Sequence, residues 1–161
     1  MLTPRGPMLL EYNCRFGDPE TQVLTSLLDS DLYEILISCA KGNLRRSQVS
    51  WAAGCSACTV VCAAPGYPGS YPKGLPLTGV AEANQVPGVQ VFHAGTKLSS
   101  TSSLVTSGGR VVTVTGVGAG IQEAVLKAYA GVDSISFEGK EYRKDIARRA
   151  IDAPVRIGVL G

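Results

Sequence analysis

A short polar segment near the amino terminus carries the residue types that phosphoryl chemistry uses. Glu11, Asn13 and Arg15 alternate along the chain directly after an apolar run. Alternation at the end of a strand places these three side chains on one side, with Tyr12 and Cys14 on the other. A carboxylate, an amide oxygen and a guanidinium are therefore expected to converge on one surface.

Glu11 and Asn13 have the chemistry of magnesium ligands. Mg²⁺ prefers hard oxygen ligands, often one or two from the protein, with phosphate and water oxygens completing its coordination. Arg15 could then neutralise a phosphoryl or acyl-phosphate oxygen beside the metal. The alternative is an ion pair between Glu11 and Arg15 at the strand end, without a catalytic role.

An apolar strand is predicted directly before these residues. Residues 8–12 are mostly apolar, and turn residues precede them at Pro4, Gly6 and Pro7. Residues 13–19 are predicted to form a loop because they are mainly polar and include a glycine and a proline. The candidate ligands would thus lie where a strand passes into a loop.

Two helices are predicted after this loop. From Glu20 onward, apolar residues recur at the spacing of one helical face. The second helix takes Ser30 or Asp31 as its N-cap and ends at Gly42. Its inward-facing residues are predicted to be Leu32, Ile35, Leu36 and Cys39.

The rest of the chain is predicted to be a small mixed domain, which follows a connection at residues 43–54. Residues 65–79 form an extended loop with four prolines and four glycines, and residues 98–103 form a serine-rich hairpin tip. The expected strands are residues 57–63, 89–93, 104–107 and 110–115, with a short one at Ile135 and Phe137. The expected helices are residues 121–129 and 145–151. The predicted fold class is α+β.

Composition limits the class of protein. The 161 residues carry a net charge of only +2, which does not favour nucleic acid or an acidic membrane as a partner. No run of about 18 apolar residues is present, and the amino terminus lacks a signal-peptide pattern. Five cysteines, an odd number, predict free thiols in a reducing cytoplasm.

Three weaker signals have structural interpretations. Cys55, Cys58 and Cys62 lack the second ligand pair of a zinc site, so Cys58 and Cys62 are predicted to pack as small hydrophobes in a strand. His93, the only histidine, is predicted to be a hydrogen-bonded turn residue or a contact at the edge of a substrate. The glycines within residues 116–120 are predicted to turn the chain before a helix, and not to bind an anion.

The order Glu11-x-Asn13-x-Arg15 at a strand end resembles the metal-binding signature of ATP-grasp enzymes. Extended by Phe-Gly-Asp-Pro-Glu-Thr-Gln at residues 16–22, it is similar to the version in the phosphoribosylamine–glycine ligase family. Segments that resemble the C-terminal domain of that family follow at residues 66–74, 91–96, 107–111 and 137–146. The resemblance covers about residues 1–151.

The resemblance implies a division of the chain and an activity. Residues 1–42 would be the C-terminal end of an ATP-grasp domain, residues 43–151 a small mixed α/β C-terminal domain, and residues 152–161 a tail or the start of a further domain. The family is a carbon–nitrogen ligase of de novo purine biosynthesis. It joins glycine to 5-phosphoribosylamine through a glycyl phosphate, and releases ADP and phosphate. ATP, glycine, 5-phosphoribosylamine and Mg²⁺ or Mn²⁺ are the implied ligands, and fusion to later purine-pathway domains is implied for animals.

The resemblance also assigns roles to the polar segment. Glu11 and Asn13 would hold metal ions that bridge ATP oxygens, and Arg15 would be the catalytic residue that stabilises charge at the acyl phosphate. Asp18 and Glu20 would bind substrate, by orienting Arg15 or the substrate amine. An intact ligase of the family carries a long segment before the position of Met1, so the chain is expected to be a fragment that is inactive alone. The alternative is a non-catalytic binding or interface module built on the same C-terminal domain.

Overall fold

The computed structural model describes residues 1–152 of the chain, so nearly all of the expected tail at residues 152–161 lies outside the described residues. The architecture is α+β, as predicted. Its elements, in chain order, are β1 (Leu2–Thr3), β2 (Gly6–Pro7), α1 (Glu20–Leu27), α2 (Leu32–Ala40), the 3-10 helix η1 (Arg46–Gln48), β3 (Ser56–Ala63), α3 (Val80–Gln85), β4 (Val89–His93), β5 (Thr96–Leu98), β6 (Leu104–Thr106), β7 (Arg110–Gly118), α4 (Ile121–Ser134) and α5 (Arg148–Asp152). None of the helices within residues 1–152 is both long enough and apolar enough to cross a bilayer.

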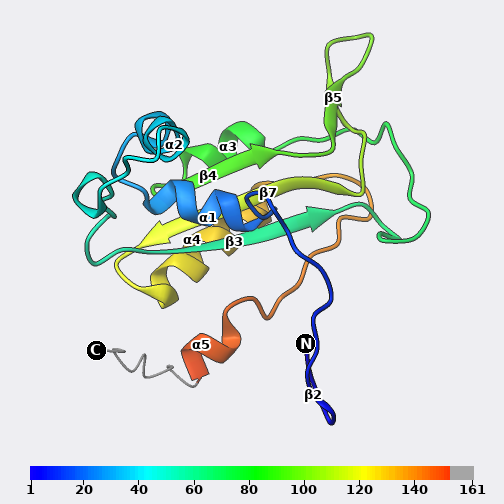
Figure 1. Ribbon diagram of the computed structural model, residues 1–161. Coiled ribbons are helices and arrows are strands. Elements are labelled where there is room, and N and C mark those ends of the chain that lie inside the picture. Colours follow the sequence, from blue (N-terminus) through cyan, green and yellow to red (C-terminus); the bar gives the residue numbers. More distant parts are fainter. Residues whose placement is uncertain (153–161) are drawn as a thin grey trace.

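The centre of the fold is a three-stranded antiparallel sheet in the order β3-β7-β4. The middle strand β7 is rich in valine and threonine, which suit a pleated surface packed on both sides. Residues 111–116 of β7 are all buried. Figure 1 shows why: α4 covers one face of the sheet, while α1 lies across the other.

The core lies between the sheet and α4, with α3 beside them. Small residues let the helix approach the sheet closely, because a Cβ atom at Gly131 would lie 2.7 Å from the side chains of Val89 and Val114. Ala124 and Ala128 on the same helix are completely buried. The completely buried strand residues of the core include Val60, Cys62, Val111, Val112 and Val114.

The glycine-rich run before α4 has a packing role that differs from the prediction. Gly116 and Gly118 lie inside β7, where the sequence analysis expected a turn. A Cβ atom at Gly116 would lie 3.0 Å from the Cα of Ala128 and closer still to two backbone atoms of α4. Glycine is required here because helix backbone occupies the space that a side chain would need.

We expect Gly116→Ala to lower the free energy of unfolding by about 1–3 kcal/mol, since overpacking pushes α4 away from the sheet. Urea unfolding followed by circular dichroism measures the change. Leu126→Ala is the matched control on the same helix: its side chain is 72% exposed, so a shift of no more than about 0.5 kcal/mol is expected. A Gly116→Ala chain as stable as the parent would contradict this account of the close packing.

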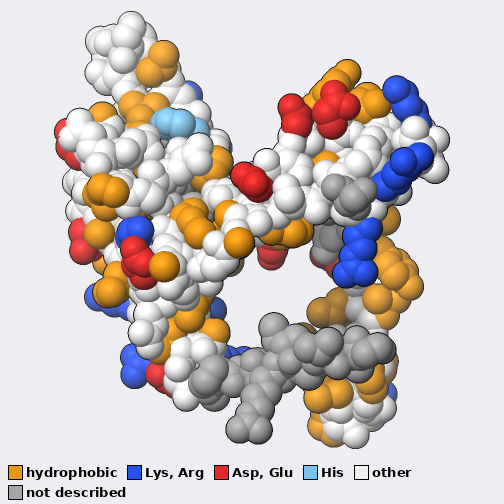
Figure 2. Space-filling view, turned by 90° about the vertical axis from the view of Figure 1, so that its left-hand side faces the viewer, with side chains coloured by type: hydrophobic (Ala, Val, Ile, Leu, Met, Phe, Trp, Pro, Cys, Tyr) orange, Lys and Arg blue, Asp and Glu red, His pale blue; other side chains and the backbone are white. Residues whose placement is uncertain are grey.

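The strand predicted at residues 8–12 is wrong. These residues form no strand in the described structure, and Leu9, Leu10 and Tyr12 are at least 66% exposed. A strand needs a neighbour for its backbone hydrogen bonds, and apolar composition alone does not supply one. The hairpin β1–β2 precedes this segment, and Figure 2 shows hydrophobic side chains on the surface of this amino-terminal arm at the lower right.

The two helices predicted after the loop are confirmed as α1 and α2. Asp31 is the N-cap of α2, and its carboxylate accepts hydrogen bonds from the amides of Tyr33 and Glu34. The prediction of which residues of α2 face inward was partly wrong, because Leu36 and Cys39 are exposed and Ser38 is buried. Periodicity defines an apolar stripe, but packing against the neighbouring connection selects which side of the helix is covered.

The remaining elements agree with the prediction in type more than in extent. The strands at residues 57–63 and 89–93 and the hairpin tip at residues 98–103 are confirmed. The segments at residues 104–107 and 110–115 belong to different sheets. Ser136 makes only an isolated bridge with Thr78, so no strand forms at residues 135–137, although Ile135 and Phe137 are buried. Helix α3 was not predicted.

Candidate active site

The loop before α1 forms one open hollow of about 340 Å³. Its lining consists of Glu11, Asn13, Arg15, Gly17, Asp18 and Glu20, which includes all five residues selected from the sequence. Except for Gly17, these residues are exposed. The side chains therefore converge as the alternation suggested, even though the strand that was expected to hold them does not form.

Glu11 and Asn13 are in direct contact. The amide nitrogen Nδ2 of Asn13 donates a hydrogen bond to Oε1 of Glu11 over 3.1 Å. A cation between them would need the amide oxygen on this side, which a half-turn of the exposed amide group provides. The carboxylate and amide donor set thus fits a hard cation such as Mg²⁺, with room for phosphate oxygens. The alternative ion pair between Glu11 and Arg15 is absent from the ion pairs of the described residues.

Arg15 is held only locally. Its Nη1 donates to the backbone oxygen of Phe16 over 3.0 Å, and the side chain is exposed. Within the described residues it forms no ion pair with Asp18 or Glu20, so neither carboxylate orients it in this structure. A guanidinium without a carboxylate partner remains available to an anionic ligand.

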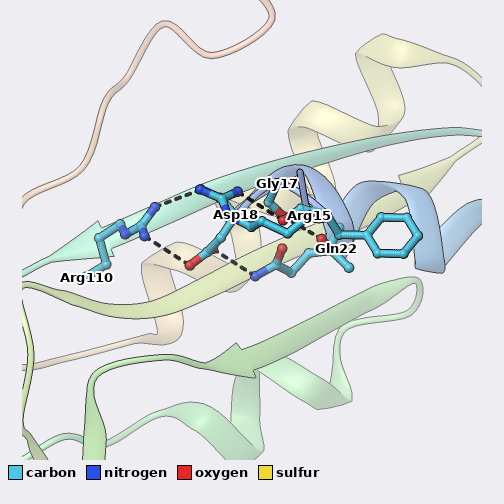
Figure 3. A network of polar contacts seen from close by, with 7 residues as sticks. Arg15, Gly17, Asp18, Gln22 and Arg110 are labelled. Atoms are coloured by element: carbon cyan, nitrogen blue, oxygen red, sulfur yellow. Dashed lines mark hydrogen bonds and ion pairs between the residues drawn. The ribbon is translucent and has the colours of Figure 1, made fainter. Parts of the chain in front are cut away.

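Asp18 has a different partner, which lies far away in the sequence. Nη2 of Arg110 lies 3.1 Å from Oδ2 of Asp18, and Nη1 donates to the backbone oxygen of Asp18 over 2.7 Å. Figure 3 shows Arg110 reaching from the start of β7 to the loop, while Gln22 contacts the same carboxylate from α1. The sequence analysis missed this contact. Arg110 lay within a family-like segment, but nothing local linked it to a residue 92 positions earlier.

Helix α1 supports the loop from its other end. The backbone amide of Thr21 donates to the carbonyl of Gly17 over 3.0 Å, and its hydroxyl contacts the same oxygen. Because α1 packs against β3 and β7, this first turn places the end of the loop above the sheet. The loop therefore enters α1 at a defined point above the sheet, and its polar side chains are exposed to solvent.

A second hollow of about 350 Å³ lies beside the first. It is lined by Val61, Ala63, Tyr67, Arg110, Glu141, Tyr142 and Arg143, so Arg110 lines one hollow and binds the loop that lines the other. Arg143 makes two hydrogen bonds to Asp145, and this contact lowers the pKa of the Asp145 carboxyl. Three of the family-like segments, at residues 66–74, 107–111 and 137–146, contribute to this hollow.

The cysteines and the histidine have structural surroundings. Cys58 and Cys62 are buried in the core as predicted, and burial raises the pKa of the Cys62 thiol to about 11 although Lys140 opposes the shift. Both thiols therefore stay protonated at neutral pH. His93 is hydrogen-bonded as predicted, since its Nδ1 lies 3.0 Å from the hydroxyl of Thr96, but it is the last residue of strand β4 and not a turn residue. Among the described residues, no three His, Cys, Asp or Glu side chains form a cluster that could hold a metal ion.

Comparisons with known proteins agree with the fold and with the family that the sequence resembles. The family described as "Phosphoribosylglycinamide synthetase, C domain" matches residues 57–149. The chain is 48% identical over 151 residues to a phosphoribosylamine–glycine ligase of a Nostoc species. This match covers 92% of the chain and 35% of the relative. It is also 50% identical over 151 residues to the trifunctional purine biosynthetic protein adenosine-3 of Gallus gallus. That match covers 94% of this chain and 15% of the relative. A crystal structure of phosphoribosylamine–glycine ligase from Thermotoga maritima superposes with a TM-score of 0.73 and 36% identity, over 90% of this chain and 34% of that one.

Proposed function

The chain belongs to the phosphoribosylglycinamide synthetase C-domain family, and from this premise we propose that it acts as the C-terminal part of a phosphoribosylamine–glycine ligase. The activity is the ATP-dependent joining of glycine to 5-phosphoribosylamine, with ADP and phosphate as the other products. The observation that carries the proposal is the single hollow lined by Glu11, Asn13 and Arg15. The chain spans about a third of the ligase relatives that it matches, so it would act with the remainder of a ligase.

Glu11 and Asn13 would hold Mg²⁺ or Mn²⁺ in this proposal. The metal, when bound, would screen the charge between ATP and the carboxylate that accepts the phosphoryl group. Arg15 would lie beside it and stabilise negative charge on the acyl phosphate, since its guanidinium has no carboxylate partner in the described structure. Asp18 and Glu20 would border the substrate, although the Asp18 carboxylate is already bound to Arg110.

The proposed boundaries follow the same reasoning. Residues 1–42 would complete an ATP-grasp domain, and residues 43–151 would form the C-terminal domain, which contains the family match at residues 57–149. Helix α1 would then join the two, because it packs on the sheet of the second domain. Fusion to later purine-pathway enzymes, as the name of the Gallus gallus relative indicates for that protein, and a cytoplasmic location are further parts of the proposal.

A chimeric ligase tests the function. The matched part of this chain, 92% of its length, would replace the region of the Nostoc ligase to which it is 48% identical. If the chain supplies the C-terminal half of the site, the chimera should release ADP in a manner that depends on both glycine and 5-phosphoribosylamine. A coupled assay for ADP, with each substrate omitted in turn, measures this.

The informative control is the Nostoc ligase lacking the replaced region, which should be inactive. A folded chimera that shows no substrate-dependent ADP release would contradict the proposal. That result would favour a non-catalytic interface module built on the same C-terminal domain.

A further inference from the structure

We propose that Arg110 is a positioning residue for the metal-binding loop, and that it acts through Asp18. This inference rests on the proposed function, because it concerns how Glu11 and Asn13 are held. Arg110 does not line the hollow that contains these two residues. Its effect on them would come from fixing where the loop lies above the sheet.

Arg110 is the long-range polar contact of the loop. Within the described residues, the hydrogen bonds and ion pairs of residues 8–18 stay inside residues 1–22, apart from those made by Arg110. Residues 8–16 also form no strand in the described structure. Among the described residues, the side chain of Arg110 is therefore the polar contact between this segment and the C-terminal sheet, in addition to the packing of α1 on that sheet.

The geometry of the contact restricts both position and rotation. One guanidinium nitrogen binds the backbone oxygen of Asp18, and the other binds its carboxylate, over 2.7 and 3.1 Å. A planar guanidinium that makes two bonds defines the orientation of its partner, which a single ammonium does not. The peptide of Asp18 and its side chain are thereby held together.

The base of the contact is rigid. Arg110 is the first residue of β7, the central strand, and lies opposite Ala63 of β3. Its backbone oxygen accepts a hydrogen bond from Gly95 over 2.8 Å. The loop is thus attached to the end of the central strand of the sheet, which limits its motion relative to the sheet at Asp18.

The contact should matter for position more than for global stability. The side chains of Arg110 and Asp18 are 38% and 47% exposed, and exposed ion pairs contribute little to unfolding free energies. Metal affinity should respond more than the free energy of unfolding does, since loss of a residue that orients metal ligands typically weakens metal binding by about 10- to 100-fold. A role in positioning therefore predicts a loss of affinity without a matching loss of fold.

The test compares the 161-residue chain with its Arg110→Gln variant. ¹⁵N relaxation without metal should show the order parameters of residues 11–18 falling from about 0.85 to below about 0.6. Mn²⁺ titration followed by water proton relaxation should show about tenfold weaker binding. Arg110→Lys keeps the positive charge but loses the two-pronged guanidinium. Its loop order parameters and Mn²⁺ affinity should lie between those of the parent chain and those of Arg110→Gln. Arg148→Gln is the matched control, because it removes an arginine–aspartate pair elsewhere and should change neither reading.

Asp18→Asn approaches the same contact from the loop and leaves β7 intact, which covers the case in which Arg110→Gln unfolds. It should weaken Mn²⁺ binding, and combining it with Arg110→Gln should add less than the sum of the two effects. Unchanged loop order and unchanged Mn²⁺ affinity in a folded Arg110→Gln chain would overturn the inference. Glu11→Gln distinguishes failure of the proposed metal site from failure of the positioning role of Arg110. If Glu11→Gln abolishes Mn²⁺ binding while Arg110→Gln has no effect, only the positioning role fails. If Glu11→Gln leaves Mn²⁺ binding intact, the proposed metal site itself fails.

Discussion

In the chimeric ligase, Glu11→Gln is expected to lower turnover by about 10²–10³-fold with little change in folding. The substitution keeps the size of the side chain and one oxygen, but removes the negative charge that attracts a divalent cation. Loss of a single group that stabilises transition-state charge in acyl transfer costs a factor of this order. Glu11 is exposed, and among the described residues its side chain makes a hydrogen bond with the Asn13 amide and no ion pair, so the fold does not depend on its charge.

The measurement is ADP release at saturating ATP and glycine, together with a thermal unfolding midpoint for each protein. Glu34→Gln is the matched control, since it removes an exposed carboxylate from the first turn of α2 and leaves the hollow unchanged. Raising the Mg²⁺ concentration should restore part of the lost rate if metal affinity is the cause. Normal turnover of the Glu11→Gln chimera would exclude Glu11 as a metal ligand.

The 161-residue chain by itself should show no detectable ligase turnover. Acyl-phosphate chemistry needs ATP, glycine and the amine held together with water excluded, because glycyl phosphate hydrolyses readily. In the described structure the hollow at residues 11–20 is bordered by one loop and by the first residue of α1, and is open to solvent. Proximity alone can account for about 7–11 kcal/mol of barrier reduction, so the absence of opposing surfaces removes activity and does not merely weaken it.

The coupled ADP assay with both substrates tests this directly, with the chimera as the positive control under identical conditions. The matched background is the Glu11→Gln form of the chain, whose signal should equal that of the parent chain. Glycine-dependent turnover by the chain alone, near the rate of the chimera, would refute the view that it supplies only part of the site.

Much of the fold could be predicted because the relevant signals are local. The strands expected at residues 57–63 and 110–115 form as β3 and β7, and helical spacing indicated α1, α2 and α4. The capping chemistry of Asp31 needs only its own neighbours, so the start of α2 followed from sequence. Buried Cys58 and Cys62 were predictable for the same reason, because small apolar residues within a covered strand face the core.

In the candidate site, too, the sequence predicted those features that depend on neighbouring residues. Glu11, Asn13 and Arg15 were identified from the sequence alone because their types and their spacing of two lie within one short segment, and the resemblance to a ligase family rests on that segment. Their convergence does not require the strand that was expected. It needs only a loop whose alternate side chains face one hollow.

Tertiary structure decided what distant residues do to that segment. The failed strand at residues 8–12 shows that apolar composition cannot form a strand without a partner, which composition does not reveal. The requirement for glycine at position 116 arises from helix backbone that the chain brings back several residues later. The bond from Arg110 to Asp18 spans 92 positions, and no local preference of either residue encodes it. It exists because β7 lies at the centre of the sheet and α1 crosses its face, so only the packed fold brings the two charges together.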